Sequence, residues 1–194
     1  MHKHADLDPS GSPAAPSHGS IASAKRLSGL FLSWAKDKKM NLINARADTL
    51  FVKPAFRASA KRRRCLILAD GYYEWKSFSP KKKQPYYLRP KDDRPIAFVG
   101  IWDCWKGEAV PIESCSIITT DANELPRPIH DRMRVIVRGA DAEAWIDPGT
   151  DDPKALGSLL RPFSAEEMSA FPISSRMGKV GENDAGMIEP AIVN

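Results

Sequence analysis

The chain has 194 residues, of which 42% are hydrophobic and 27% are charged, and this size suits one compact domain and excludes several independent ones. Its three cysteines lack C-x-x-C spacing, its longest mostly apolar stretch (residues 96–102) is far below the roughly 18 residues of a membrane span, and its first thirty residues lack the apolar segment of a signal peptide. We therefore expect a cytoplasmic protein without a disulfide framework, a cysteine zinc site or membrane contact. The net charge of +5 is uneven, because residues 35–94 carry 17 basic and 6 acidic groups whereas residues 95–194 carry 9 and 16.

The first 28 residues are rich in Ser, Ala, Pro, Gly and His and have no apolar periodicity, which predicts a disordered low-complexity tail over residues 1–28. Three of the four histidines lie in this tail, so a histidine-based metal centre is not expected. From residue 29 onward, short runs of β-branched and aromatic residues alternate with turn residues, as is typical of a β-rich domain. The candidate strands are residues 65–69, 72–76, 85–88, 96–103, 114–120 and 134–137.

Turn and helix signals complete the expected fold. Residues 77–84 contain a proline and three lysines, which predicts an exposed hairpin loop. Residues 140–146 are a short helix candidate, Asp152 with Pro153 predicts a capped helix start, and Ser164 with Glu167 has the spacing of a capping box. Strands followed by a few helices predict a single α+β domain over residues 29–194.

Asn44 and Arg46 are the first pair of candidate functional residues. They lie two positions apart in the sequence LINARADT, so on an extended backbone both side chains project from one face. An amide beside a guanidinium suits the binding of a phosphate or a sugar oxygen, because arginine offers a planar fork of donors and asparagine both donates and accepts. The alternative is an edge strand with two solvated polar side chains.

Glu74 lies in the sequence ADGYYEW, where Asp70 and Gly71 predict a turn into a strand. Its sequence neighbours are Tyr73 and Trp75, whose bulk is expected to exclude water and to favour general acid or base chemistry. The alternative is that Glu74 forms an ion pair with Lys76 or with a nearby arginine.

His130 is the only histidine of the expected domain, and it lies beside Asp131 and Arg132 in the proline-rich segment LPRPIHDRM. Histidine titrates near neutrality, and a neighbouring carboxylate can fix its tautomer. A structural role is the alternative, but a loop that follows an expected buried strand favours function.

The basic middle of the chain predicts contact with nucleic acid. Two runs, Lys61 to Arg64 and Lys81 to Lys83, concentrate the positive charge, and aromatic residues that include Trp34 and Trp75 lie between and before them as candidate stacking platforms. This pattern is typical of a surface that binds single-stranded DNA. The alternative is a solvated charged surface.

Six segments of residues 29–191 resemble, in the same order, the SRAP family of SOS response-associated peptidase-like proteins, which process abasic sites in DNA. These segments are GLFLSWAKD, LINARADT, RRRCLILADGYYEW, SIITTDAN, IHDRM and FPISSRMGKVGENDAGMIEP. The resemblance implies a partly closed antiparallel barrel of short strands with a few helices, and it implies no cofactor, no metal and no obligate protein partner. It also implies a nucleoid-associated protein of the DNA damage response that binds single-stranded DNA and cross-links to abasic sites, with peptidase and lyase chemistry.

The resemblance assigns roles to individual residues. In the catalytic set, Asn44 orients the attacking amine, Glu74 is the general acid or base, and His130 protonates the sugar oxygen on ring opening. Arg46 corresponds to the phosphate-contacting arginine, and Thr119 lies on the strand that lines the same site. The residues expected to contact DNA are Trp34, Arg46, Trp75, Thr119 and Arg132.

The start of the chain departs from the family pattern. Family members begin Met-Cys-Gly-Arg, and their amino-terminal cysteine supplies the amine and the thiol that form a thiazolidine with the sugar aldehyde. This chain begins Met1-His2-Lys3, so we expect the first strands of the domain to be missing and the covalent chemistry to be impaired. A non-catalytic single-stranded DNA-binding module and a non-functional truncated copy are the alternatives.

Overall fold

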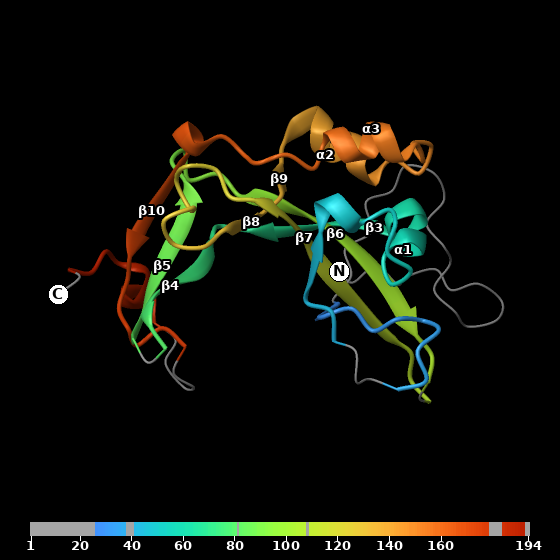
Figure 1. Ribbon diagram of the computed structural model, residues 1–194, viewed down its shortest axis with the longest axis horizontal. Coiled ribbons are helices and arrows are strands. Elements are labelled where there is room, and N and C mark those ends of the chain that lie inside the picture. The colour runs from blue at the N-terminus through green and yellow to red at the C-terminus, as the bar shows by residue number, and fades with distance from the viewer. Residues whose placement is uncertain (1–25, 38–40, 81, 108, 179–183, 193–194) are drawn as a thin grey trace, which may run out of the picture.

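The computed structural model describes residues 26–37, 41–80, 82–107, 109–178 and 184–192. Their strands form two sheets, which stand beside a group of helices at one end of the molecule (Figure 1). The seven-stranded sheet contains β1 (Leu27–Ser28), β2 (Asn44–Arg46), β3 (Arg64–Ala69), β6 (Ile96–Trp105), β7 (Ile112–Asp121), β8 (Arg132–Arg134) and β9 (Ile136–Val137). The three-stranded sheet contains β4 (Tyr72–Ser79), β5 (Lys82–Pro90) and β10 (Met168–Pro172).

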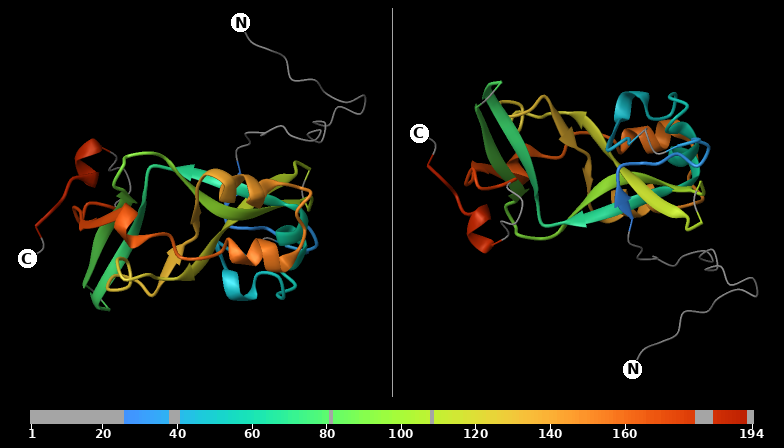
Figure 2. Two further views of the ribbon diagram at one scale, coloured as in Figure 1. Left: turned by 90° about the horizontal axis from the view of Figure 1, so that it is seen from above. Right: turned by 90° about the horizontal axis from the view of Figure 1, so that it is seen from below.

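Short helices connect and cover the strands. The α-helices are α1 (Arg57–Arg62), α2 (Gly139–Ile146) and α3 (Pro153–Ser158), and the 3-10 turns are η1 (Ala47–Thr49), η2 (Ala165–Glu167) and η3 (Ala185–Ile188). The three α-helices gather at the end of the molecule away from the three-stranded sheet, as all three views show (Figures 1 and 2). The expected α+β class is thereby confirmed.

Strand β7 is the centre of the larger sheet. It pairs antiparallel with β6 and then β8 along one edge, and parallel with β1 and β2 along the other. These two parallel pairs are an addition to the partly closed antiparallel barrel that the family resemblance implies. No tight hairpin joins β1 or β2 to β7, so the turn geometry that enforces antiparallel pairing elsewhere does not act on them.

Two apolar cores lie on the two faces of the seven-stranded sheet. The core on the helix side includes Ala45, Ile118 and the fully buried Trp145 of α2. The indole Nε1 of Trp145 donates to the carbonyl oxygens of Cys65 and Gly100, each at 3.2 Å, which ties α2 to β3 and β6. The second core lies between the two sheets and includes Tyr72, Leu88 and Phe98, with Ile117 packed against it.

Several local signals are confirmed. Strands β3, β4, β5, β6 and β7 cover the five runs expected between residues 65 and 120, and α2 covers residues 140–146. The Asp152 carboxylate accepts hydrogen bonds from the backbone N–H groups of Lys154 and Ala155 at 3.1 and 3.2 Å, so it caps α3 as expected. The expected strand over residues 134–137 is divided into β8 and β9.

Other expectations are wrong in part. The exposed hairpin expected at residues 77–84 is present, but its loop is shorter than expected, because β4 continues to Ser79 and β5 begins at Lys82. The Ser164 side chain makes no capping bond, and only the 3-10 turn η2 follows it, because the chain then enters β10 and pairs with β5 over five residues. Residues 27–28 pair with β7 although the tail was expected to reach residue 28, and the tail residues 1–25 lie outside the described residues.

We predict that Trp145→Ala lowers the free energy of unfolding by about 3–5 kcal/mol, because it empties a fully buried site and removes the donor to two carbonyl groups. Trp34→Ala is the control, because Trp34 is 61% exposed and its removal should change that free energy by no more than about 0.5 kcal/mol. Urea denaturation followed by circular dichroism measures both values. Equal losses in the two variants would contradict the assigned core.

Candidate functional site

One face of the seven-stranded sheet collects most of the polar residues identified in the sequence. Arg46 of β2, Thr119 of β7 and Arg134 of β8 are direct cross-strand partners, so their side chains share a face. Asn44 lies two residues before Arg46 on the same face. The intervening Ala45 points the other way, into the helix-side core. The polar face is therefore the one that looks toward the three-stranded sheet.

Glu74 of β4 reaches this face through an ion pair. Its Oε1 accepts a hydrogen bond from Nη1 of Arg134 at 2.6 Å, and the two side chains are only 18% and 23% exposed. The guanidinium carbon of Arg134 lies 4.5 Å from the ring centroid of Tyr72 and 5.8 Å from that of Phe98. The alternative in which Glu74 pairs with a nearby arginine is thus the observed one.

The aromatic surroundings of Glu74 differ from those expected. Tyr73 points to the opposite face of β4, where its ring lies 5.3 Å from that of Tyr87. The aromatic residue on the side of Glu74 is Tyr72, whose hydroxyl group is buried without a hydrogen-bond partner among the described residues. Burial is also the main reason that the pKa of Tyr72 lies well above its usual range. Sequence adjacency failed here because neighbouring side chains of a strand point to opposite faces.

Arg46 is held by a carboxylate of its own segment. Its Nε and Nη2 donate to the two carboxylate oxygens of Asp48 at 3.2 and 2.7 Å. This bond lowers the pKa of Asp48 and raises that of Arg46, and the nearby carboxylates of Asp121 and Asp131 raise the Arg46 pKa further. Both members of the pair are mostly exposed. The guanidinium is therefore charged, oriented and open to exchange of its partner.

Arg132 and His130 follow at the end of the same sheet. Arg132 donates from Nη1 to the Asp121 carboxylate at 2.5 Å and from Nη2 to the Thr119 carbonyl oxygen at 2.7 Å. Its backbone N–H donates to Nδ1 of His130 at 3.0 Å, and a carboxylate oxygen of Asp131 lies 3.1 Å from the same nitrogen. In the neutral ring this bond leaves the hydrogen on Nε2, so Nε2 is the atom that can donate a hydrogen bond.

The structure thus brings together six of the eight expected site residues. These are Asn44, Arg46, Glu74, Thr119, His130 and Arg132. The sequence interpretation missed Arg134, which anchors Glu74. The available signal was its place two residues after Arg132, because side chains two positions apart on an extended backbone share a face.

The two expected stacking tryptophans lie elsewhere. Trp34 follows Ser33, whose backbone N–H donates to the Asp103 carboxylate. Asp103 is the cross-strand partner of Ser114, which lies five residues before Thr119 on β7. At about 3.3 Å per residue, Ser114 is roughly 17 Å along β7 from Thr119 of the polar face. Trp75 alternates with Glu74 on β4 and lies against Gly178 on the outer side of the small sheet. Neither tryptophan lies on the polar face, and their contact with DNA remains a prediction.

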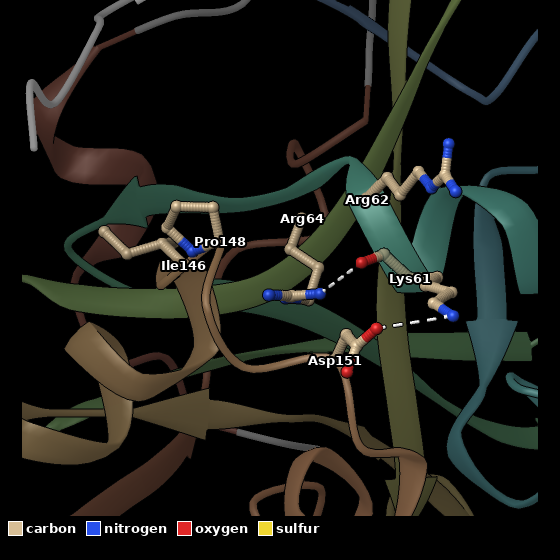
Figure 3. Close-up of a pocket in the computed structure, with 6 residues that line it drawn as sticks. All are labelled: Lys61, Arg62, Arg64, Ile146, Pro148 and Asp151. Carbon is tan, nitrogen blue, oxygen red and sulfur yellow. Dashed lines mark hydrogen bonds and ion pairs between the residues drawn. The ribbon is translucent and has the colours of Figure 1, made fainter. Parts of the chain in front are cut away.

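Two arginines of the basic run from Lys61 to Arg64 are held by contacts within the fold. Nε of Arg64 donates to the Trp145 carbonyl oxygen at 2.5 Å, and its other nitrogens donate to four more backbone carbonyl oxygens. Figure 3 shows Arg64 at a pocket of about 290 Å³, bonded to the backbone oxygen of Lys61. Burial lowers the pKa of this arginine. Arg63 pairs with the buried Asp103 at 3.3 Å. In the second basic run Lys83 is exposed, and Lys81 lies outside the described residues.

Within the ranges that the structure describes, no three His, Cys, Asp or Glu side chains are grouped as metal ligands. Over the same ranges no helix has the length and apolar character needed to span a membrane.

Comparison with known proteins gives consistent matches. The family model of SOS response associated peptidase (SRAP) matches residues 17–180. The chain is 43% identical over 164 residues to the abasic site processing protein YoqW of Bacillus subtilis (strain 168), which covers 83% of this chain and 73% of that protein. It is 32% identical over 191 residues to the abasic site processing protein HMCES of Gallus gallus, which covers 84% of this chain and 55% of that protein.

A solved structure supports the same relationship. A protein from Bacteroides thetaiotaomicron superposes with a TM-score of 0.79 at 34% identity and covers 85% of this chain and 75% of its own. The family resemblance of the six sequence segments is confirmed. The family match begins at residue 17, within the segment expected to be a tail.

We predict that Arg64→Met destabilises the fold by about 2–4 kcal/mol and leaves the salt dependence of DNA binding unchanged. The reason is that its guanidinium satisfies five backbone carbonyl groups around α1 and α2 and has no role on the polar face. Denaturant titration and DNA binding at several salt concentrations measure the two effects. A variant that is as stable as the wild type but binds DNA more weakly would contradict this prediction and would indicate that the basic run contacts DNA.

Proposed function

Because the chain belongs to the SOS response associated peptidase family, we propose that it processes abasic sites, binding single-stranded DNA and coupling covalently to the opened sugar. The observation that supports this best is the polar face that Asn44, Arg46 and Arg134 share, to which Arg134 anchors Glu74. His130 binds the backbone of Arg132, two residues before Arg134. Association with the nucleoid and a part in DNA damage repair would follow from this substrate.

Arg46 and Arg132 are the proposed phosphate contacts. In the free protein each is paired with an exposed carboxylate, Asp48 and Asp121, whose side chains are 52% and 82% exposed. A phosphate can replace such a carboxylate, because its oxygens accept hydrogen bonds from the same guanidinium donors. These donors are Nε and Nη2 of Arg46 and Nη1 of Arg132. Binding then releases counterions from the strand, so affinity falls as salt rises.

The proposed chemistry begins with opening of the abasic sugar. His130 in its protonated form donates a proton from Nε2 to the ring oxygen as the bond of that oxygen to C1′ breaks, which leaves a neutral imidazole. Glu74 accepts the proton of the C1′ hydroxyl group, which leaves an aldehyde. An amine of the protein, oriented by Asn44, then adds to C1′ and forms a C–N bond. The two hydrogens of the amine pass as protons to the former carbonyl oxygen, which leaves as water, and a C=N bond forms in the resulting Schiff base.

A DNA-binding module without chemistry is the second candidate. The ion pairs of Arg46 and Arg132 favour it, because their carboxylate partners are exposed and a phosphate can replace them whether or not a sugar reacts. The two functions separate in one assay. A binding module retains abasic single-stranded DNA but yields no adduct after borohydride treatment.

We predict that Arg46→Ala weakens binding of single-stranded DNA by about 1–3 kcal/mol and reduces the slope of log affinity against log salt by about one, because one phosphate contact is lost. Fluorescence anisotropy with a labelled oligonucleotide at four salt concentrations measures both. Arg161→Ala is the control, since Arg161 is an exposed arginine that bonds to Asp141 at 2.6 Å near the helices. Equal effects of the two substitutions would exclude Arg46 from the interface.

We predict that Glu74→Gln slows formation of the borohydride-trapped adduct with abasic DNA by roughly 10²- to 10⁴-fold, because the proton acceptor is lost, while the dissociation constant changes little. Gel analysis of a quenched time course at saturating protein measures the rate. Glu113→Gln is the matched control, because Glu113 also pairs with an arginine, Arg26, at the far end of β7. An adduct that forms at the same rate in Glu74→Gln would refute the catalytic role.

A further inference from the structure

Three arginines on the polar face each hold a carboxylate, but the three pairs are not equivalent. The carboxylates that bind Arg46 and Arg132 are exposed, and a phosphate can displace them. Glu74 is 18% exposed and its partner Arg134 is 23% exposed. Exchange of Glu74 for a phosphate would leave a half-buried carboxylate without its counter-charge, which is energetically costly. This third pair is therefore a fixed element of the site.

The position of Arg134 is fixed from two directions. Its backbone pairs with Thr119 in the sheet, and its guanidinium lies over the rings of Tyr72 and Phe98. Those rings are buried and pack edge to face, with centroids 5.7 Å apart and an interplanar angle of 79°. A guanidinium that stacks on fixed rings loses little further freedom when it donates a hydrogen bond.

The hydrogen bond to Glu74 uses only one carboxylate oxygen. Nη1 of Arg134 donates to Oε1 at 2.6 Å, and Oε2 accepts no hydrogen bond from any residue that the structure describes. One oxygen is thus anchored while the other is free to accept a proton. A general base requires this arrangement, because it must be both oriented and unoccupied.

We propose that Arg134 is a positioning residue for the reaction with abasic DNA, which acts by anchoring Oε1 of Glu74 and keeping Oε2 available for proton transfer. This inference rests on the proposed function of Glu74. It assigns Arg134 no contact with DNA, which distinguishes it from Arg46 and Arg132.

The experiment compares Arg134→Met and Arg134→Lys with the wild-type chain. Methionine keeps the apolar contact with the two rings but cannot donate, and lysine restores a positive donor. Two values are measured for each variant with an abasic single-stranded oligonucleotide. They are the dissociation constant by fluorescence anisotropy, and the rate constant of borohydride-trapped adduct formation at saturating protein, which reports the chemical step alone.

We expect Arg134→Met to lower the rate constant at least tenfold with a dissociation constant within threefold of wild type, and Arg134→Lys to recover most of the rate. In a Glu74→Gln background, Arg134→Met should slow the reaction less than twofold further, because the group that it positions is already removed. Arg138→Met is the matched control. Arg138 also stacks on a ring, Phe163 at 5.3 Å, and also binds a carboxylate, Asp92, at 3.0 Å.

Each other outcome overturns the inference in its own way. Weaker binding with an unchanged rate at saturation would make Arg134 a DNA contact, and an equal loss of rate in Arg138→Met would indicate a general effect on the fold. A reactive wild-type chain with an equally reactive Arg134→Met would remove the positioning role and leave the proposed function intact. A wild-type chain that forms no trapped adduct would refute the proposed function and the role of Arg134 with it.

Discussion

Strand β7 has hydrogen-bonded neighbours along both edges, and the register of these pairs determines what the site contains. Thr119 stands between Arg46 of β2 and Arg134 of β8, so the three side chains project from one face. A slip of β2 by one residue would turn Asn44 and Arg46 into the helix-side core, where Ala45 is now fully buried. Burial of an unpaired guanidinium there is so unfavourable that the register has no close competitor.

The second sheet contributes Glu74, and packing decides where this carboxylate stands. Tyr72 and Phe98 lie in the core between the sheets, and Arg134 covers their rings at the rim of that core. The ion pair with Glu74 therefore joins β4 to β8 at the point where the apolar contact between the sheets ends. A pair at this depth contributes little net stability, because desolvation offsets much of the attraction. Its main consequence is a fixed orientation of the carboxylate.

Local chemistry in the sequence predicts much of this molecule. Runs of β-branched and aromatic residues identified β3 to β7, Asp152 with Pro153 identified the start of α3, and alternation identified Asn44 and Arg46 as neighbours on one face. These features depend on residues within a few positions of one another, where steric and capping preferences act directly.

Features set by distant parts of the chain could not be predicted in this way. Glu74 meets Arg134 across 60 residues, and no local pattern states that this arginine is its partner. Ser164 has the spacing of a capping box, yet pairing of the next residues with β5 prevents a helix. Arg64 belongs to a basic run that suggests DNA binding, but backbone carbonyl groups at the ends of α1 and α2 accept hydrogen bonds from its guanidinium. In each case tertiary contacts outweigh the local preference.

Hydrogen–deuterium exchange of the whole chain, with and without a saturating abasic single-stranded oligonucleotide, tests most directly whether the polar face is the functional surface. The account predicts slower exchange on binding in residues 44–48, 72–76 and 129–134. It predicts no change in residues 57–64 and 145–156, which surround the basic pocket near the helices. Protection confined to the helix side, with the segments of Arg46, Glu74 and His130 unchanged, would contradict it.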